Sequence, residues 1–152
     1  MKINLIKTIS GLLPADPDSE ESYKKIKTGS MVETETKEVR NPAFLRKYFA
    51  LINIGYDNWV PPKVSSIYGV PEKNYKKFRD DVTILAGYFH IVIRLDGSTQ
   101  IVADSISFAN MVEETFGKLY NATITVLLKR VYNDTLSKED LDNIVNSYMS
   151  FT

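Results

Sequence analysis

The chain has 152 residues, of which 43% are hydrophobic, and its 19 basic and 19 acidic side chains give it zero net charge. This length is typical of one domain and this composition suffices for a hydrophobic core, so we expect a single domain over residues 1–152. The absence of cysteine excludes disulfides, thiolate nucleophiles and cysteine-ligated zinc. The apolar runs are too short to cross a bilayer or to form a signal peptide, so we expect a cytoplasmic protein without a membrane partner.

Charge is unevenly distributed along the sequence. Between residues 37 and 79 there are nine basic residues and three acidic ones, whereas from residue 80 onward there are ten acidic residues and five basic ones. The sequence therefore combines a basic middle segment with an acidic C-terminal half.

The first forty residues predict a strand, a helix and a second strand. Apolar and polar residues alternate over residues 2–9, which favours a strand. After turn signals around Gly11 and Pro14, Asp18 or Ser19 is expected to cap a short helix that runs to residue 26. Residues 31–39 are weakly alternating and β-branched, which predicts another strand with one solvated face.

The strongest local signal is a helix over residues 42–55. Asn41 is expected at the N-cap and Pro42 at the first helical position, and the apolar residues that follow cover one broad face. Gly55 is typical of a helix C-terminus. Trp59 and the two prolines after Val60 indicate a rigid exit, and residues 60–70 are expected to form a loop.

The remaining sequence predicts a helix from residue 71 or 72 to 86, a hairpin over residues 88–104 that turns at Asp96 and Gly97, a helix over 111–131 and a last helix capped by Ser137. The fold class is therefore α+β, with a small, mostly antiparallel sheet of the N-terminal strands and the hairpin, packed by three longer helices. The helices at 42–56 and 111–131 are both broadly apolar, so we expect a homodimer.

Two segments resemble a known family. The sequence NPAFLRKYFALINIG at residues 41–55, followed by Trp59, and the sequence SISFANM at residues 105–111 are similar to a family of uncharacterised proteins encoded by lambdoid phages and prophages. In that family a longer segment separates the tryptophan from the hairpin.

The order of elements also resembles the NinB/Orf recombination proteins of lambdoid phages. Arg46, Lys47 and Tyr48 match an Arg-Lys-aromatic motif of those proteins, although the Gln-Asn pair that precedes it there is missing here. The SISFANM segment matches their Ser-x-Ser-x-x-x-Met segment. This resemblance implies a dimeric protein that prefers single-stranded DNA and helps to load a recombinase in the bacterial host.

The basic middle segment carries the residue types that bind single-stranded DNA, because Lys and Arg contact phosphates while aromatic rings stack on bases. The candidate nucleic-acid-binding residues are Arg40, Arg46, Lys47, Lys63, Tyr68, Lys73, Lys76, Lys77 and Arg79. The alternative is that these charges only solvate helix faces.

Catalytic motifs are missing from the sequence. His90 is the only histidine and the glycines are scattered, so neither a metal-binding histidine pair nor a phosphate-cradling loop is present. A metal-dependent nuclease would have to use Asp80, Asp81, Asp96 and Asp104, although Asp96 is explained by the turn. We therefore expect no cofactor and no enzyme, but a phage-encoded DNA-binding accessory protein. The alternatives are an interaction protein that blocks a host defence factor such as a CRISPR effector and, after it, the nuclease.

Overall fold

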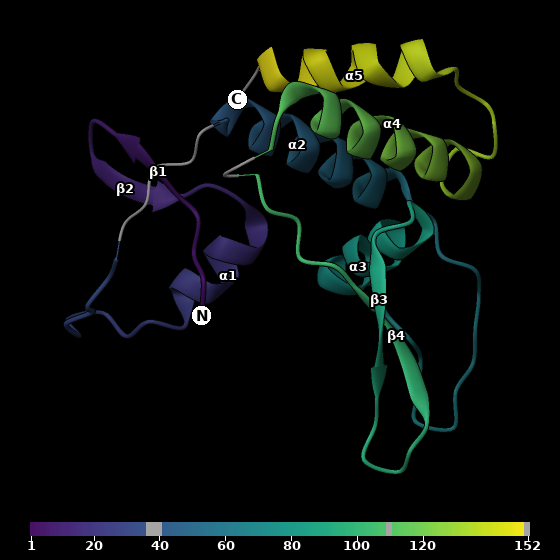
Figure 1. The fold of residues 1–152 in the computed structure, drawn as a ribbon, viewed down its shortest axis with the longest axis horizontal. Helices are drawn as coiled ribbons and strands as arrows, with labels where there is room; N and C mark the ends of the chain where they lie inside the picture. The colour runs from purple at the N-terminus through teal and green to yellow at the C-terminus, as the bar shows by residue number, and fades with distance from the viewer. Residues whose placement is uncertain (36–40, 109–110, 151–152) are drawn as a thin grey trace. The chain divides into compact units, whose positions relative to one another are not determined.

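A computed structural model of the chain describes residues 1–35, 41–108 and 111–150 (Figure 1). The chain divides into two compact units, Met1–Val39 and Arg40–Thr152. The α+β class is confirmed: over the described residues, five helices accompany antiparallel strands, which form two separate two-stranded sheets, one in each unit. No helix among the described residues combines the length and the hydrophobicity needed to cross a membrane.

The N-terminal unit contains a hairpin and a short helix. Strands β1 (Leu5–Thr8) and β2 (Gly11–Pro14) pair antiparallel, and α1 (Pro17–Lys24) follows. The prediction of a strand at 31–39 is wrong over residues 31–35, with which no strand of the described part of the chain pairs, and residues 36–39 lie outside the described residues. Side-chain alternation alone does not make a strand where no partner satisfies its backbone.

Helix α1 begins two to three residues earlier than predicted. Its N-cap is Asp16, whose carboxylate accepts hydrogen bonds from the backbone N–H of Ser19 at 2.8 Å and from its hydroxyl at 2.9 Å. The backbone N–H of Asn4 donates in turn to the Ser19 hydroxyl at 2.8 Å. Buried Asp16 and Ser19 thus tie the start of the chain to the start of the helix.

The core of the second unit lies between α2 (Pro42–Asn58), α4 (Glu113–Arg130) and α5 (Lys138–Ser150). The side chains that are most completely excluded from solvent come from these helices: Tyr48, Leu51, Ile52, Leu119, Thr123, Leu127, Leu141 and Val145. The apolar faces of the helices predicted at 42–56 and 111–131 are therefore covered within the chain. The homodimer expected from these faces stays a prediction.

Helix α2 begins as predicted but does not end at Gly55. Asn41 precedes it, with its carbonyl accepting from the N–H of Phe44 at 3.2 Å. Gly55 lies inside the helix, where a Cβ atom would stand 2.8 Å from a methyl carbon of Leu127. The glycine therefore allows α2 and α4 to approach closely instead of ending the helix.

Helix α3 (Tyr75–Leu85) and the hairpin of β3 (Phe89–Ile93) and β4 (Thr99–Ala103) complete this unit. Asn74 caps α3 by accepting from the N–H of Lys77 at 2.9 Å, so the helix starts three to four residues later than predicted. The hairpin is confirmed, with Gly97 at a φ of 85° in its turn. Helix α3 contacts β4 as well as α2 and α4.

Candidate functional site

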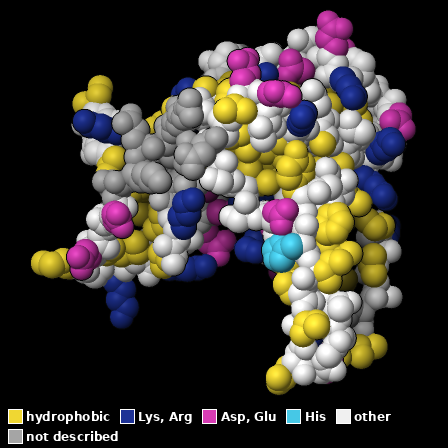
Figure 2. Space-filling model, viewed as in Figure 1, with side chains coloured by type: hydrophobic (Ala, Val, Ile, Leu, Met, Phe, Trp, Pro, Cys, Tyr) yellow, Lys and Arg dark blue, Asp and Glu magenta, His cyan; other side chains and the backbone are white. Residues whose placement is uncertain are grey.

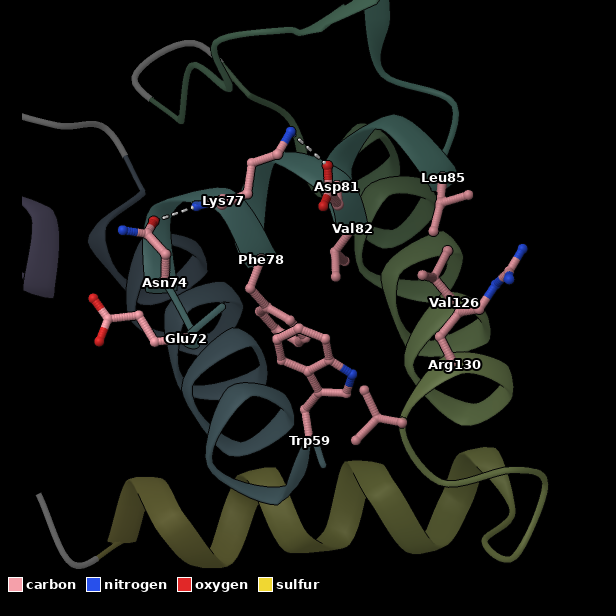
Figure 3. A pocket seen from close by; sticks show the side chains of 11 residues that line it. Trp59, Glu72, Asn74, Lys77, Phe78, Asp81, Val82, Leu85, Val126 and Arg130 are labelled. Atoms are coloured by element: carbon pink, nitrogen blue, oxygen red, sulfur yellow. Dashed lines mark hydrogen bonds and ion pairs between the residues drawn. The ribbon is translucent and has the colours of Figure 1, made fainter. Parts of the chain in front are cut away.

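A pocket of about 270 Å³ opens between α3, α4 and the end of α2 (Figure 3). Its apolar lining consists of Trp59, Phe78, Val82, Leu85, Val126 and Val131. Its charged and polar lining consists of Glu72, Asn74, Lys77, Asp81 and Arg130. An apolar floor with a few charged groups around it is the usual composition of a ligand site.

Trp59 is placed in this pocket by the end of α2. It is the C-cap residue, and its N–H donates to the carbonyl of Tyr56 at 3.2 Å. Its half-buried ring packs against Phe78, with ring centroids 5.3 Å apart at an angle of 35°. Figure 3 shows both rings pointing into the space between α3 and α4. The pocket thus has an aromatic wall.

Lys73 binds the same turn at the end of α2. Its ammonium donates to the carbonyl oxygens of Tyr56 at 2.7 Å and of Trp59 at 2.8 Å, and lies 4.5 Å from the centre of the Tyr56 ring. A cation at the last carbonyls of a helix is favoured by the helix dipole. Lys73 was predicted to bind nucleic acid, but in the structure two of its three donors are engaged in closing α2.

The three cations of α3 have different surroundings. Lys76 pairs with Asp80 at 3.2 Å and Lys77 with Asp81 at 3.1 Å, and both lysines are well exposed. Arg79 lies over the ring of Phe49, 5.7 Å from its centre. Exposed pairs of this kind contribute at most about 1 kcal/mol. A phosphate that approaches Lys76 or Lys77 can therefore replace the carboxylate at little cost.

The cations of α2 are used differently. Arg46 is exposed, whereas Lys47 lies 3.3 Å from the carboxylate of Asp142 and over the ring of Tyr120. Tyr48, the aromatic residue that follows Lys47, is only 1% exposed. Of these three consecutive residues, Arg46 is the most exposed and Tyr48 is buried.

Asp142 joins three helices. It accepts a hydrogen bond from the Tyr120 hydroxyl at 2.6 Å and pairs with Lys47, so α5 is tied to α4 and α2. The bond from Tyr120 lowers the pKa of Asp142, with help from the Lys47 ammonium and against partial burial. Burial, reinforced by the neighbouring carboxylate, raises the pKa of Tyr120. The Lys47 position is therefore part of the packing of the helices.

The loop before α3 presents the other candidates. Lys63 is exposed, and Tyr68 is 94% exposed at a turn where its N–H donates to the Ser66 hydroxyl at 3.0 Å. Arg40 lies outside the described residues. The structure thus brings Lys73, Lys76, Lys77 and Arg79 to one end of α3, leaves Arg46 and Lys47 on α2, and holds Lys63 and Tyr68 on the loop.

Sequence reasoning missed Trp59 and Arg130 as site residues. Trp59 was read as the exit of a helix and Arg130 lay in the acidic half of the sequence. A single tryptophan beside two prolines was the available signal for Trp59. For Arg130 no local signal existed, because only the packing of α4 brings it to the pocket.

The four aspartates considered for a nuclease are engaged separately. Asp80 and Asp81 form ion pairs with lysines of α3. Asp96 accepts hydrogen bonds from Ser98 in the hairpin turn, which lower the pKa of Asp96. Asp104 lies 2.8 Å from Nδ1 of His90 on the hairpin. Among the described residues, no group of three or more histidine, aspartate or glutamate side chains is placed to hold a metal ion.

Comparison with known proteins identifies the family. No curated protein and no solved structure matches the chain. Two segments, residues 1–72 and 64–151, match the model of one family, which is described as a protein of unknown function, DUF1367. The matches together span almost the whole sequence and overlap over residues 64–72, in the loop before α3. The chain therefore belongs to the DUF1367 family.

Proposed function

We propose that this protein binds single-stranded DNA without catalysing a reaction on it, and that the pocket beside Trp59 receives one unpaired base. The observation that supports the proposal is the combination of an aromatic wall with Lys77 and Arg130 among the lining residues. The resemblance to NinB/Orf proteins suggests the setting, a phage recombination accessory protein in the cytoplasm of the bacterial host.

The size and lining of the pocket suit a base. A volume of about 270 Å³ is slightly below the range of roughly 300 to 1,000 Å³ that is typical of sites for whole ligands, and so fits one ring system of a larger molecule. Stacking of a base on an aromatic side chain contributes about 1–3 kcal/mol and requires an unpaired base. The carboxylates of Glu72 and Asp81 can accept hydrogen bonds from base amino groups.

The surrounding cations supply the phosphate contacts. Arg130 is exposed, and no ion pair with another described residue involves it. Lys76 and Lys77 hold only exposed, weak pairs. Lys63 and Tyr68, on the loop that leads to the pocket, add a charge and a ring for the neighbouring nucleotides. Binding by these groups releases counterions and depends steeply on salt.

The experiment uses Trp59, the only tryptophan, as a fluorescent reporter inside the proposed site. Oligothymidylate and a duplex of equal length are titrated into the protein across a salt series. We expect quenching by the single strand, weaker binding of the duplex and a steep loss of affinity with rising salt.

The Lys77→Ala/Arg130→Ala double variant should bind about tenfold more weakly at low salt. It should also lower the slope of log affinity against log salt by about 1.4 in magnitude, since two phosphate contacts are lost. Lys118→Ala is the matched control, because Lys118 is an equally exposed lysine of α4 in an i,i+4 pair with Glu114. Absence of binding at about 50 mM salt, or equal binding by the double variant and the control, refutes the proposal.

A second candidate is an interaction protein, which would include an inhibitor of a host defence factor. The observation that favours it is the large apolar side chains exposed on the second unit, among them Ile67, Val70, Ile91 and Ile93. Absence of DNA binding at low salt would favour this second function, because the exposed apolar surface would then be the remaining candidate for binding a partner.

A further inference from the structure

The hairpin of β3 and β4 carries an uncovered apolar face. Its register places Phe89 opposite Ala103, Ile91 opposite Ile101 and Ile93 opposite Thr99, and residues directly opposite each other share a face. Ile91 is 65% exposed and Ile93 is 79% exposed. Hydrophobic side chains lie along the hairpin in Figure 2.

This face needs a partner. A two-stranded hairpin by itself is at best marginally stable in water, and its β-branched side chains stabilise it when they are packed. Phe89, Ile91, Ile93 and Ile101 together leave on the order of 500 Å² of apolar surface exposed. A patch of that size is in the range of the largest apolar patch on a typical monomer, about 300–600 Å², which is often functional.

We propose that the partner is a second copy of this chain, bound through the same hairpin face. A twofold interface sets each residue of a patch against the same patch on the other copy, so it excludes patches with a surplus of one charge. This face has no charged side chain: Phe89, Ile91, Ile93, Thr99, Ile101 and Ala103 make it up. The ionic groups His90, Arg94 and Asp104 are on the opposite face.

The area agrees with a dimer. A standard interface buries roughly 800 Å² on each partner, and about 65% of a homodimer interface is apolar. The apolar part of such an interface is therefore about 500 Å², close to what the hairpin exposes. The homodimer predicted from the helices is thus assigned to a different surface, since the helix faces are buried.

The first test is the mass in solution, measured by light scattering after size exclusion over a concentration series. We expect the wild-type protein at twice 17.3 kDa. Ile91→Ser/Ile93→Ser should weaken the dimer at least about a hundredfold. The control, Arg94→Ser/Gln100→Ser, changes two exposed, mutually bonded residues of the opposite face and should remain dimeric. A monomeric wild-type protein, or a dimer that persists in the isoleucine variant, overturns the proposal.

A second test does not depend on the folding of that variant. Because the chain has no cysteine, a single introduced thiol reacts alone with a short bis-maleimide. Thr99 and Gln100 are adjacent and both exposed but lie on opposite faces of the hairpin. Thr99→Cys should give a covalent dimer and Gln100→Cys should not. Equal cross-linking of the two variants, or cross-linking of Gln100→Cys alone, overturns the proposal.

Discussion

The contact between Gly55 and Leu127 decides whether Gly55→Ala stabilises or destabilises the protein. Replacing a glycine by alanine inside a helix normally stabilises a protein by about 1 kcal/mol. At Gly55 the new methyl carbon would lie 2.8 Å and 3.1 Å from the two methyl carbons of Leu127. Because Leu127 is 0% exposed, it can retreat only by displacing other core side chains.

The two effects can be compared. Overpacking a buried site costs about 1–3 kcal/mol, so Gly55→Ala should be destabilised by about 1 kcal/mol after the gain in helix propensity. Gly117 is the matched control, since it lies inside α4 with open space around the position of its missing Cβ. Gly117→Ala should be stabilised by about 0.5–1 kcal/mol.

Urea unfolding followed by circular dichroism measures both variants. The same substitution in a Leu127→Ala variant shows whether Leu127 is the cause of the destabilisation. In that variant the methyl carbons that obstruct position 55 are gone, so Gly55→Ala should stabilise the protein by about 1 kcal/mol. The reasoning is refuted if Gly55→Ala and Gly117→Ala shift the midpoint in the same direction, or if the sign at position 55 does not change in the Leu127→Ala background.

Three further changes test contacts in the second unit. Lys73→Met keeps the side-chain stem but removes the ammonium from the end of α2, and should lower the free energy of urea unfolding by about 2 kcal/mol. The control Lys76→Met, at an exposed pair, should lower it by at most about 0.5 kcal/mol. Equal losses would contradict the role of Lys73 as the cap of α2. Asp142→Asn weakens the bond from Tyr120 and should cost about 1 kcal/mol at pH 7, allowing for solvent screening. Folding lowers the pKa of Asp142, so the ionised carboxylate adds to the free energy of unfolding above its unfolded pKa near 4, and this stability is lost as the pH falls from there through the folded pKa. Between pH 6 and 3 the stability of the wild type should therefore fall more steeply than that of Asp142→Asn. Parallel curves would argue against the lowered pKa. Ser137→Ala removes one half of a reciprocal cap at α5 and should cost about 1 kcal/mol in thermal unfolding, and an unchanged midpoint would show that the cap is dispensable.

Elements with strong local signals were predictable from the sequence. The turn at Asp96 and Gly97 requires a positive φ that glycine adopts freely, and Ser137 and Asp140 exchange hydrogen bonds at the start of α5. In both cases a few neighbouring residues determine the geometry. The hairpin and the last helix were accordingly found where they were predicted.

Elements that depend on distant partners were not predictable in this way. Gly55 has the local signature of a helix end, but its environment is set by Leu127, which is far away in the sequence. Residues 31–35 alternate like a strand, yet a strand also requires a neighbour to pair with.

The candidate site shows the same division. Composition identified the cations, but it did not tell which of them are engaged within the fold, because the acceptors of Lys73 and the partner of Lys47 come from other elements. The pocket likewise combines Trp59 with Arg130, residues that no pattern in the sequence connects.

The bonds of Lys73 to the last carbonyls of α2 have a consequence for the length of the segment that follows this helix. They fasten both ends of residues 60–72 to one point, so this segment leaves and re-enters the helical unit at nearly the same place. Doubling such a loop adds only about 0.6 kcal/mol to the cost of closing it. Residues inserted into or removed from this segment, which includes the overlap of the two family matches, should therefore leave the packed helices undisturbed.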